Sequence, residues 1–111
     1  MIGKIVLVPF PFSSNPAQMK VRPAIVVSNR IVNSGRDVIL MGITTHLWND
    51  RFSFPLDSQF LSNPLPRKSE IRCHYLFTIE QTLIIQEISF LHQNKQIELF
   101  EKIKALLDPT I

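Results

Sequence analysis

Short apolar runs dominate the first three quarters of the chain and predict strands. Runs rich in Ile and Val predict strands at residues 2–8, 22–28 and 38–44. Shorter or alternating runs predict further strands at residues 51–56, 69–75 and 82–90. At residues 69–75 the apolar members Ile71, Cys73 and Tyr75 alternate with Glu70, Arg72 and His74, the pattern of a half-buried strand.

Proline and polar clusters separate these strands. The segment Pro9-Phe10-Pro11-Phe12 is expected to end the first strand as an edge or a loop, because proline cannot donate a ladder hydrogen bond. Polar or proline-bearing stretches predict a loop at residues 13–20, a turn at 33–37 and a loop at 62–68.

The last segment has a helical period. Over residues 93–107 the apolar positions are expected to share one helical face: Leu99, Phe100, Ile103, Leu106 and Leu107. Asn94 is a candidate cap, Glu98 and Lys102 are spaced to pair, and Asp108-Pro109 should end the helix. The order predicts a mainly β (α+β) fold: short antiparallel strands curled into a barrel, with an amphipathic C-terminal helix over one end.

Composition narrows the class of protein. A length of 111 residues fits one domain, residues 1–111. Three glycines form neither G-x-G-x-x-G nor G-x-x-x-x-G-K, and one cysteine excludes a disulfide framework or a cysteine zinc cluster. Three histidines without ligand spacing predict no metal site, and we expect no cofactor. Without an apolar run of membrane length or a leader-like start, a soluble cytoplasmic protein is expected.

The charge is mildly basic and uneven. The net charge is +3, made of +5 over residues 1–72 and −2 over residues 73–111. Two interpretations stay open: ordinary scatter of few charges, or a basic face that attracts phosphates.

Three segments place polar groups where a core sequence has no need of them. Arg22 follows Lys20 at the head of an apolar strand, where its guanidinium could fork onto phosphate oxygens. The hydroxyls and imidazole of Thr44, Thr45 and His46 directly follow another strand. In each case the alternative is a solvated strand end.

The third segment is Arg72-Cys73-His74. In an extended strand Arg72 and His74 point to the same side, about 7 Å apart. One could stabilise a leaving oxygen while the other accepts a proton, although exposed faces are routinely charged. Cys73 should point into the core and be inert. Phenylalanines that could stack on bases, or simply fill the core, are Phe10, Phe12, Phe52 and Phe54.

These segments together resemble the PemK/MazF toxins of type II toxin–antitoxin systems, in their PemK-like branch. The similarity lies in GKIVLVPFPF at residues 3–12, RPAIVVS at 22–28, GITT at 42–45, and SEIRCH with FTIE at 69–74 and 77–80. A helix follows residue 92, as in the family. The resemblance covers nearly the whole chain.

The resemblance implies an SH3-like β-barrel, usually a homodimer, that acts as an mRNA interferase. Such an enzyme cuts single-stranded RNA without a metal, because a 2′-hydroxyl attacks the adjacent phosphate and leaves a 2′,3′-cyclic phosphate. The catalytic residues implied are Arg22, Thr44, Arg72 and His74. Arg22 would bind the phosphate and Thr44 would donate a hydrogen bond, while Arg72 would stabilise charge or act as the acid. Residues implied in RNA binding are Phe12, Gln18, Lys20, Thr45 and His46. The expected partners are single-stranded RNA and a cognate antitoxin.

Two departures from the family pattern leave alternatives open. His74 stands where the family has an Asp, and residues 15–18 lack the His or Glu that the family often carries there. Either His46 or His74 would supply the imidazole. The chain could instead be a catalytically weakened RNA- or antitoxin-binding module. A gyrase poison on the related CcdB barrel ranks last, because the C-terminus lacks the tryptophan on which those toxins depend.

Overall fold

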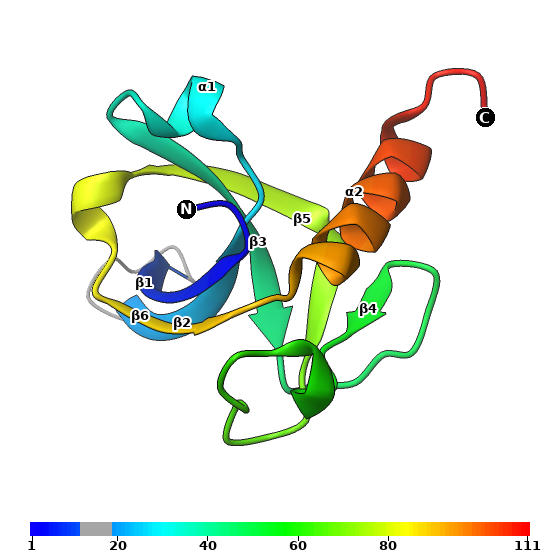
Figure 1. Cartoon of the computed structure of the whole chain (residues 1–111), viewed down its shortest axis with the longest axis horizontal. Coiled ribbons are helices and arrows are strands. Elements are labelled where there is room, and N and C mark those ends of the chain that lie inside the picture. Colours follow the sequence, from blue (N-terminus) through cyan, green and yellow to red (C-terminus); the bar gives the residue numbers. More distant parts are fainter. Residues whose placement is uncertain (12–18) are drawn as a thin grey trace.

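One curled sheet of antiparallel strands forms most of the molecule (Figure 1). The computed structural model describes residues 1–11 and 19–111. Within them the sheet has six strands: β1 (Lys4–Pro11), β2 (Met19–Val26), β3 (Asp37–Thr44), β4 (Ser53–Pro55), β5 (Glu70–Glu80) and β6 (Gln86–Phe90). Their order across the sheet is β4-β5-β3-β2-β1-β6. The predicted mainly β fold is therefore confirmed.

Short helices connect the strands. They are α1 (Arg30–Asn33) and the 3₁₀ turns η2 (Ser58–Phe60) and η3 (Gln81–Leu83). The longest helix of the described residues, α2 (Gln93–Leu107), follows β6. No helix in this part of the chain has the length and apolarity needed to cross a membrane.

The first strand does not end at Pro9 as predicted, although the proline segment does lie at an edge, the other part of the prediction. β1 continues to Pro11 and pairs with β2 through Pro9 and Pro11. On its other side, however, β6 pairs only with residues 4–7 of β1. The prolines therefore occupy an edge, where a missing N–H leaves no neighbouring carbonyl unpaired.

Both faces of the sheet are buried, which explains its continuous apolar strands. On one face a cluster of buried apolar side chains forms: Val6, Val8, Ala24, Val26, Val38 and Leu40. The other face forms a second cluster, which α2 and the segment between β4 and β5 (residues 56–69) help to cover. Its members include Ile5, Ile25, Met41, Ile71 and Cys73. Burial on both faces favours unbroken Ile and Val runs over strict alternation.

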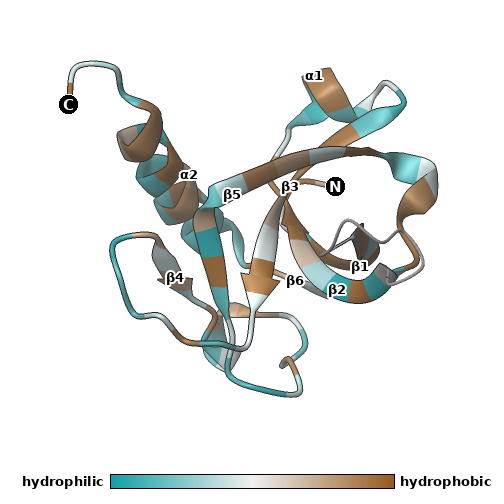
Figure 2. Ribbon diagram, turned by 180° about the vertical axis from the view of Figure 1, so that it is seen from behind, coloured by the Kyte–Doolittle hydropathy of each residue, from teal (hydrophilic) through white to brown (hydrophobic). Residues whose placement is uncertain are grey.

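The helix α2 packs through a narrower face than predicted. Leu99 is buried, and Ile103 and Leu106 are partly buried against the same cluster, whereas Phe100 and Leu107 are exposed. A strip at intervals of three and four residues faces the sheet, and their neighbours in sequence turn away by about 100°. Figure 2 shows the resulting hydrophobic and hydrophilic bands along α2.

Two local predictions for this helix were wrong. His92, not Asn94, is the N-cap residue, and its backbone carbonyl accepts the first amides. Glu98 pairs with Lys95 at 2.7 Å instead of Lys102. The Lys102 ammonium donates to the Ser53 carbonyl at 2.7 Å, which fastens α2 to β4.

Candidate active site

The predicted catalytic residues line one cleft. Arg22 comes from β2, Thr44 from the end of β3, and Arg72 and His74 from β5. The cleft has a volume of about 550 Å³, and its other lining residues are Phe10, Pro23, Gly42, Ile43, Thr45, Trp48 and Tyr75. Three strands far apart in sequence thus bring two guanidinium groups, a hydroxyl and an imidazole to one place.

An irregularity in β5 shapes this cleft. Met41 of β3 pairs with Leu76, whereas Ile43 pairs with Ile71, so residues 72–75 are out of register with β3. A bulge of this kind bends a strand and redirects its side chains. It explains why Tyr75 is exposed, against the predicted alternation. Glu70 is buried for another reason: Asn49, Ser53 and Arg72 all donate hydrogen bonds to its carboxylate.

Tyr75 packs over Gly42. A Cβ at Gly42 would lie 3.5 Å from Cδ1 of Tyr75, so the ring covers the position where another residue would carry a side chain. Gly42 therefore lies against an aromatic wall of the cleft.

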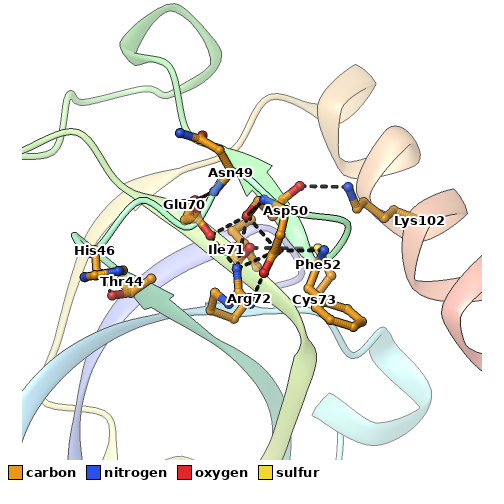
Figure 3. Close-up of polar contacts among 11 residues, drawn as sticks. Thr44, His46, Asn49, Asp50, Phe52, Glu70, Ile71, Arg72, Cys73 and Lys102 are labelled. Carbon is orange, nitrogen blue, oxygen red and sulfur yellow. Dashed lines mark hydrogen bonds and ion pairs between the residues drawn. The ribbon is translucent and has the colours of Figure 1, made fainter.

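Thr44 is oriented by its own loop. Its Oγ1 accepts the backbone N–H of His46 at 3.0 Å, so the hydroxyl proton can still be donated toward the cleft. The side chain of His46 does not line the cleft; its ring instead packs against Trp48, with ring centroids 4.4 Å apart. Figure 3 shows Thr44 and His46 set apart from the polar cluster around Arg72.

Two carboxylates hold Arg72. Asp50 accepts from both terminal nitrogens of the guanidinium, at 2.9 and 3.1 Å, and Glu70 accepts at 2.7 Å (Figure 3). The hydroxyl of Ser53 accepts a further hydrogen bond from Arg72 at 3.0 Å and donates to Glu70 at 2.6 Å. Glu70 is only 1% exposed, so its charge depends on these partners.

The ionisation of this cluster follows from its hydrogen bonds. Hydrogen bonding to Arg72 is the main reason that the pKa of Asp50 falls from 3.8 to about 2. Burial raises the pKa of Glu70, but hydrogen bonds from Ser53, Arg72 and the Asn49 amide outweigh this, and the pKa lies below the ordinary 4.5. The hydrogen bond to Asp50 raises the pKa of Arg72 above its ordinary value. Arg72 therefore retains its proton and is poorly suited to act as an acid.

His74 is exposed and lies on the same cleft as Arg72, as their spacing predicts. Its ring stacks on Phe52, with centroids 4.1 Å apart and planes 34° apart. Between these two residues Cys73 points into the core, where burial raises the pKa of its thiol to about 11. The prediction of an inert core cysteine agrees with this burial.

The sequence prediction missed the acidic side of the site. The sequence pattern gives Asp50 no role and places Glu70 on the polar face of a half-buried strand. The only local signal is that Glu70 and Arg72 are two residues apart and so share a strand face. Lys20 is exposed at the start of β2, and Phe12 and Gln18 lie outside the described residues.

Comparison with known proteins identifies the family. The chain belongs to the PemK-like, MazF-like toxins of type II toxin–antitoxin systems, whose family model matches residues 2–107. No curated protein sequence matches the chain. As a family, these toxins are endoribonucleases.

Solved structures share the fold at low identity. The chain resembles the Mycobacterium tuberculosis toxin MazF-mt6, with a TM-score of 0.76 and 22% identity over 95% of this chain and 96% of that one. It is also similar to an endoribonuclease in complex with its cognate antitoxin from a mycobacterial species, with a TM-score of 0.79, 14% identity, and coverage of 98% and 95%. The MazE-MazF complex from Deinococcus radiodurans gives a TM-score of 0.76 at 15% identity, covering 96% and 94%.

Proposed function

We propose that this toxin is an mRNA interferase, a sequence-selective endoribonuclease that cleaves single-stranded RNA without a metal ion. The observation that carries the proposal is the convergence of Arg22, Thr44, Arg72 and His74 on one cleft. The family assignment supports the same chemistry at the level of RNA cleavage.

The reaction needs no external nucleophile. The 2′-hydroxyl on the 5′ side of the scissile bond loses its proton to a base, and its oxygen forms a bond to phosphorus. The bond from phosphorus to the 5′-oxygen breaks, and that oxygen receives a proton. The products are a 2′,3′-cyclic phosphate and a 5′-hydroxyl.

The cleft supplies groups that bind the phosphate and take the 2′-hydroxyl proton, and the departing 5′-oxygen takes its proton from water. Arg22 binds the phosphate oxygens, and the Thr44 hydroxyl donates to the same phosphate or to the attacking oxygen. His74 is the base, because imidazole is the side chain best suited to proton transfer, and His74 is the imidazole that lines the cleft among the described residues. Arg72 places a guanidinium near phosphorus, but its two carboxylate partners, Asp50 and Glu70, more than offset its single charge.

We further propose a homodimer with a cognate antitoxin as its protein partner. Complexes of MazF with MazE and of an endoribonuclease with its antitoxin share this fold. A cleft with two guanidinium groups and aromatic walls suits an acidic peptide that carries large apolar side chains.

Cleavage of a mixed single-stranded RNA in excess EDTA tests the proposal. The wild type should cleave, and Arg22→Ala should lose about 10²–10³-fold in kcat/KM, since it removes a charged donor from the transition state. Arg67→Ala is the matched control, because Arg67 is exposed and lies outside the cleft. Intact RNA after incubation with folded wild-type protein would overturn the proposal.

A binding module is the second candidate, and the clamped state of Arg72 favours it. Both terminal nitrogens already contact Asp50, so Arg72 is less available to a transition state than a free guanidinium. Salt-dependent RNA binding by the wild type without cleavage would select this candidate.

A further inference from the structure

Trp48 is the single tryptophan of the chain, and 58% of its surface is exposed. It lies in the β3–β4 loop, residues 45–52, and lines the same cleft as Arg22 and Arg72. Trp48 belongs to neither core cluster, and its place in the cleft lining puts the indole where a bound ligand would contact it.

The loop that carries Trp48 is held at several points. The Asn49 amide donates to Glu70 at 3.2 Å, the Asp50 amide donates to Ser53 at 3.1 Å, and the Asp50 carboxylate holds Arg72. Asn49 takes a positive φ of 48°, a conformation that asparagine tolerates better than most residues. The exposed indole is therefore presented in a fixed place.

The surroundings of the indole suit a nucleobase. The Arg72 guanidinium lies 5.4 Å from the ring centroid, and His46 packs beside the ring. Aromatic side chains next to cations are how proteins hold single-stranded nucleic acids, since every base offers a π-face and every linkage a negative charge.

We propose that Trp48 is a stacking platform for an unpaired nucleobase next to the phosphate that Arg22 binds. The inference rests on the proposed function for its ligand, single-stranded RNA. It adds a base subsite whose contact is the ring face of Trp48, and it assigns the Arg72, Asp50 and Glu70 cluster the further role of fixing that subsite. The same exposed indole could serve a protein partner, but Arg22 in the same cleft favours a base beside a phosphate.

Because Trp48 is unique, its fluorescence reports stacking directly. The probe is a 2′-O-methyl heptanucleotide of mixed sequence, which lacks the nucleophile and stays intact. Titration into the wild type should quench the fluorescence in proportion to binding. An abasic oligomer of the same length should bind more weakly and leave the fluorescence unchanged.

Affinity measurements on variants separate stacking from loop structure. Trp48→Ala should weaken heptanucleotide binding about tenfold, whereas Trp48→Phe should retain most of it. Leu47→Ala is the matched control, because Leu47 is 41% exposed on the same loop and does not line the cleft. It should bind like the wild type.

Each result decides between the proposals. Unchanged fluorescence on saturation, or equal affinity of Trp48→Ala and wild type, would overturn the stacking platform even if the wild type cleaves RNA. Quenching by the heptanucleotide together with intact RNA in the cleavage assay would support the platform and overturn the proposed nuclease. An effect of Trp48→Ala on binding to an antitoxin peptide alone would assign the indole to a protein partner and overturn the platform.

Discussion

The Asp50 carboxylate grips the Arg72 guanidinium through both terminal nitrogens, at 2.9 and 3.1 Å. A phosphate would approach a guanidinium with the same two-point geometry. Asp50 therefore occupies the side of Arg72 that an RNA phosphate could otherwise contact. The buried Glu70 accepts another hydrogen bond from Arg72 and helps to hold it in place.

Removing this competing charge should strengthen RNA binding. Asp50→Asn keeps an oxygen to accept the Phe52 amide but releases the second anionic contact to Arg72. Affinity for a non-cleavable RNA should rise about tenfold, the equivalent of one charged hydrogen bond. Fluorescence anisotropy with a labelled oligonucleotide measures it.

Asp57→Asn is the control, since it removes the same charge from an exposed residue outside the cleft. If both variants gain the same RNA affinity, loss of one negative charge anywhere on the surface explains the effect. That result would show that Asp50 does not compete with phosphate for Arg72.

The same cluster predicts acid sensitivity. The pKa of Asp50 is lowered to about 2 and that of Glu70 lies below 4.5, so the folded protein binds fewer protons than the unfolded chain. Stability is then full above about pH 4.5 and declines as the pH falls toward 2. Thermal midpoints measured from pH 6 to 2.5 should fall less steeply for Asp50→Asn than for Asp57→Asn. Parallel curves would show that the pairing with Arg72 contributes no pH dependence.

The packing of α2 predicts a contrast between neighbouring residues. Leu99 is 3% exposed and Phe100 is 59% exposed. Leu99→Ala should lower the free energy of unfolding by about 2–5 kcal/mol through an unfilled cavity, and Phe100→Ala by less than about 0.5 kcal/mol. Urea denaturation followed by circular dichroism measures both. Comparable losses would mean that α2 buries a different face.

Gly42 should tolerate one added carbon and no more. A Cβ meets Tyr75 at an ordinary contact distance of 3.5 Å, so Gly42→Ala should retain activity. The two further methyl groups of Gly42→Val should displace the Tyr75 ring into the cleft and reduce RNA cleavage about 10–100-fold. Because valine favours strands, stability should be kept. Full activity of Gly42→Val would show that the position of the Tyr75 ring does not affect RNA cleavage.

Local patterns predicted most strands and the cleft residues. Arg22, Thr44 and Arg72 stand at strand ends or on strand faces, where residue type and position are visible in a short window. The family resemblance assigned these residues to one active site, and in the folded chain they line one cleft.

The remaining features depend on contacts between residues far apart in sequence, which local patterns do not show. The bulge that exposes Tyr75 arises from the register of β5 against β3, which lie apart in sequence. The contact between Asp50 and Arg72 likewise joins a loop to a strand 22 residues later. Pro9 and Pro11 were judged as strand breakers because the sequence did not show that β6 ends before them.

Mapping the RNA ends is the most direct test of the central claim, that the nucleophile comes with the substrate and His74 is the base. A mixed single-stranded RNA is incubated in EDTA with wild type and with His74→Ala, and both ends of every product are identified. The account predicts 2′,3′-cyclic phosphate and 5′-hydroxyl ends at a preferred sequence for the wild type, with cleavage strongly reduced by His74→Ala. Products with 5′-phosphate ends, or undiminished cleavage by His74→Ala, would contradict it.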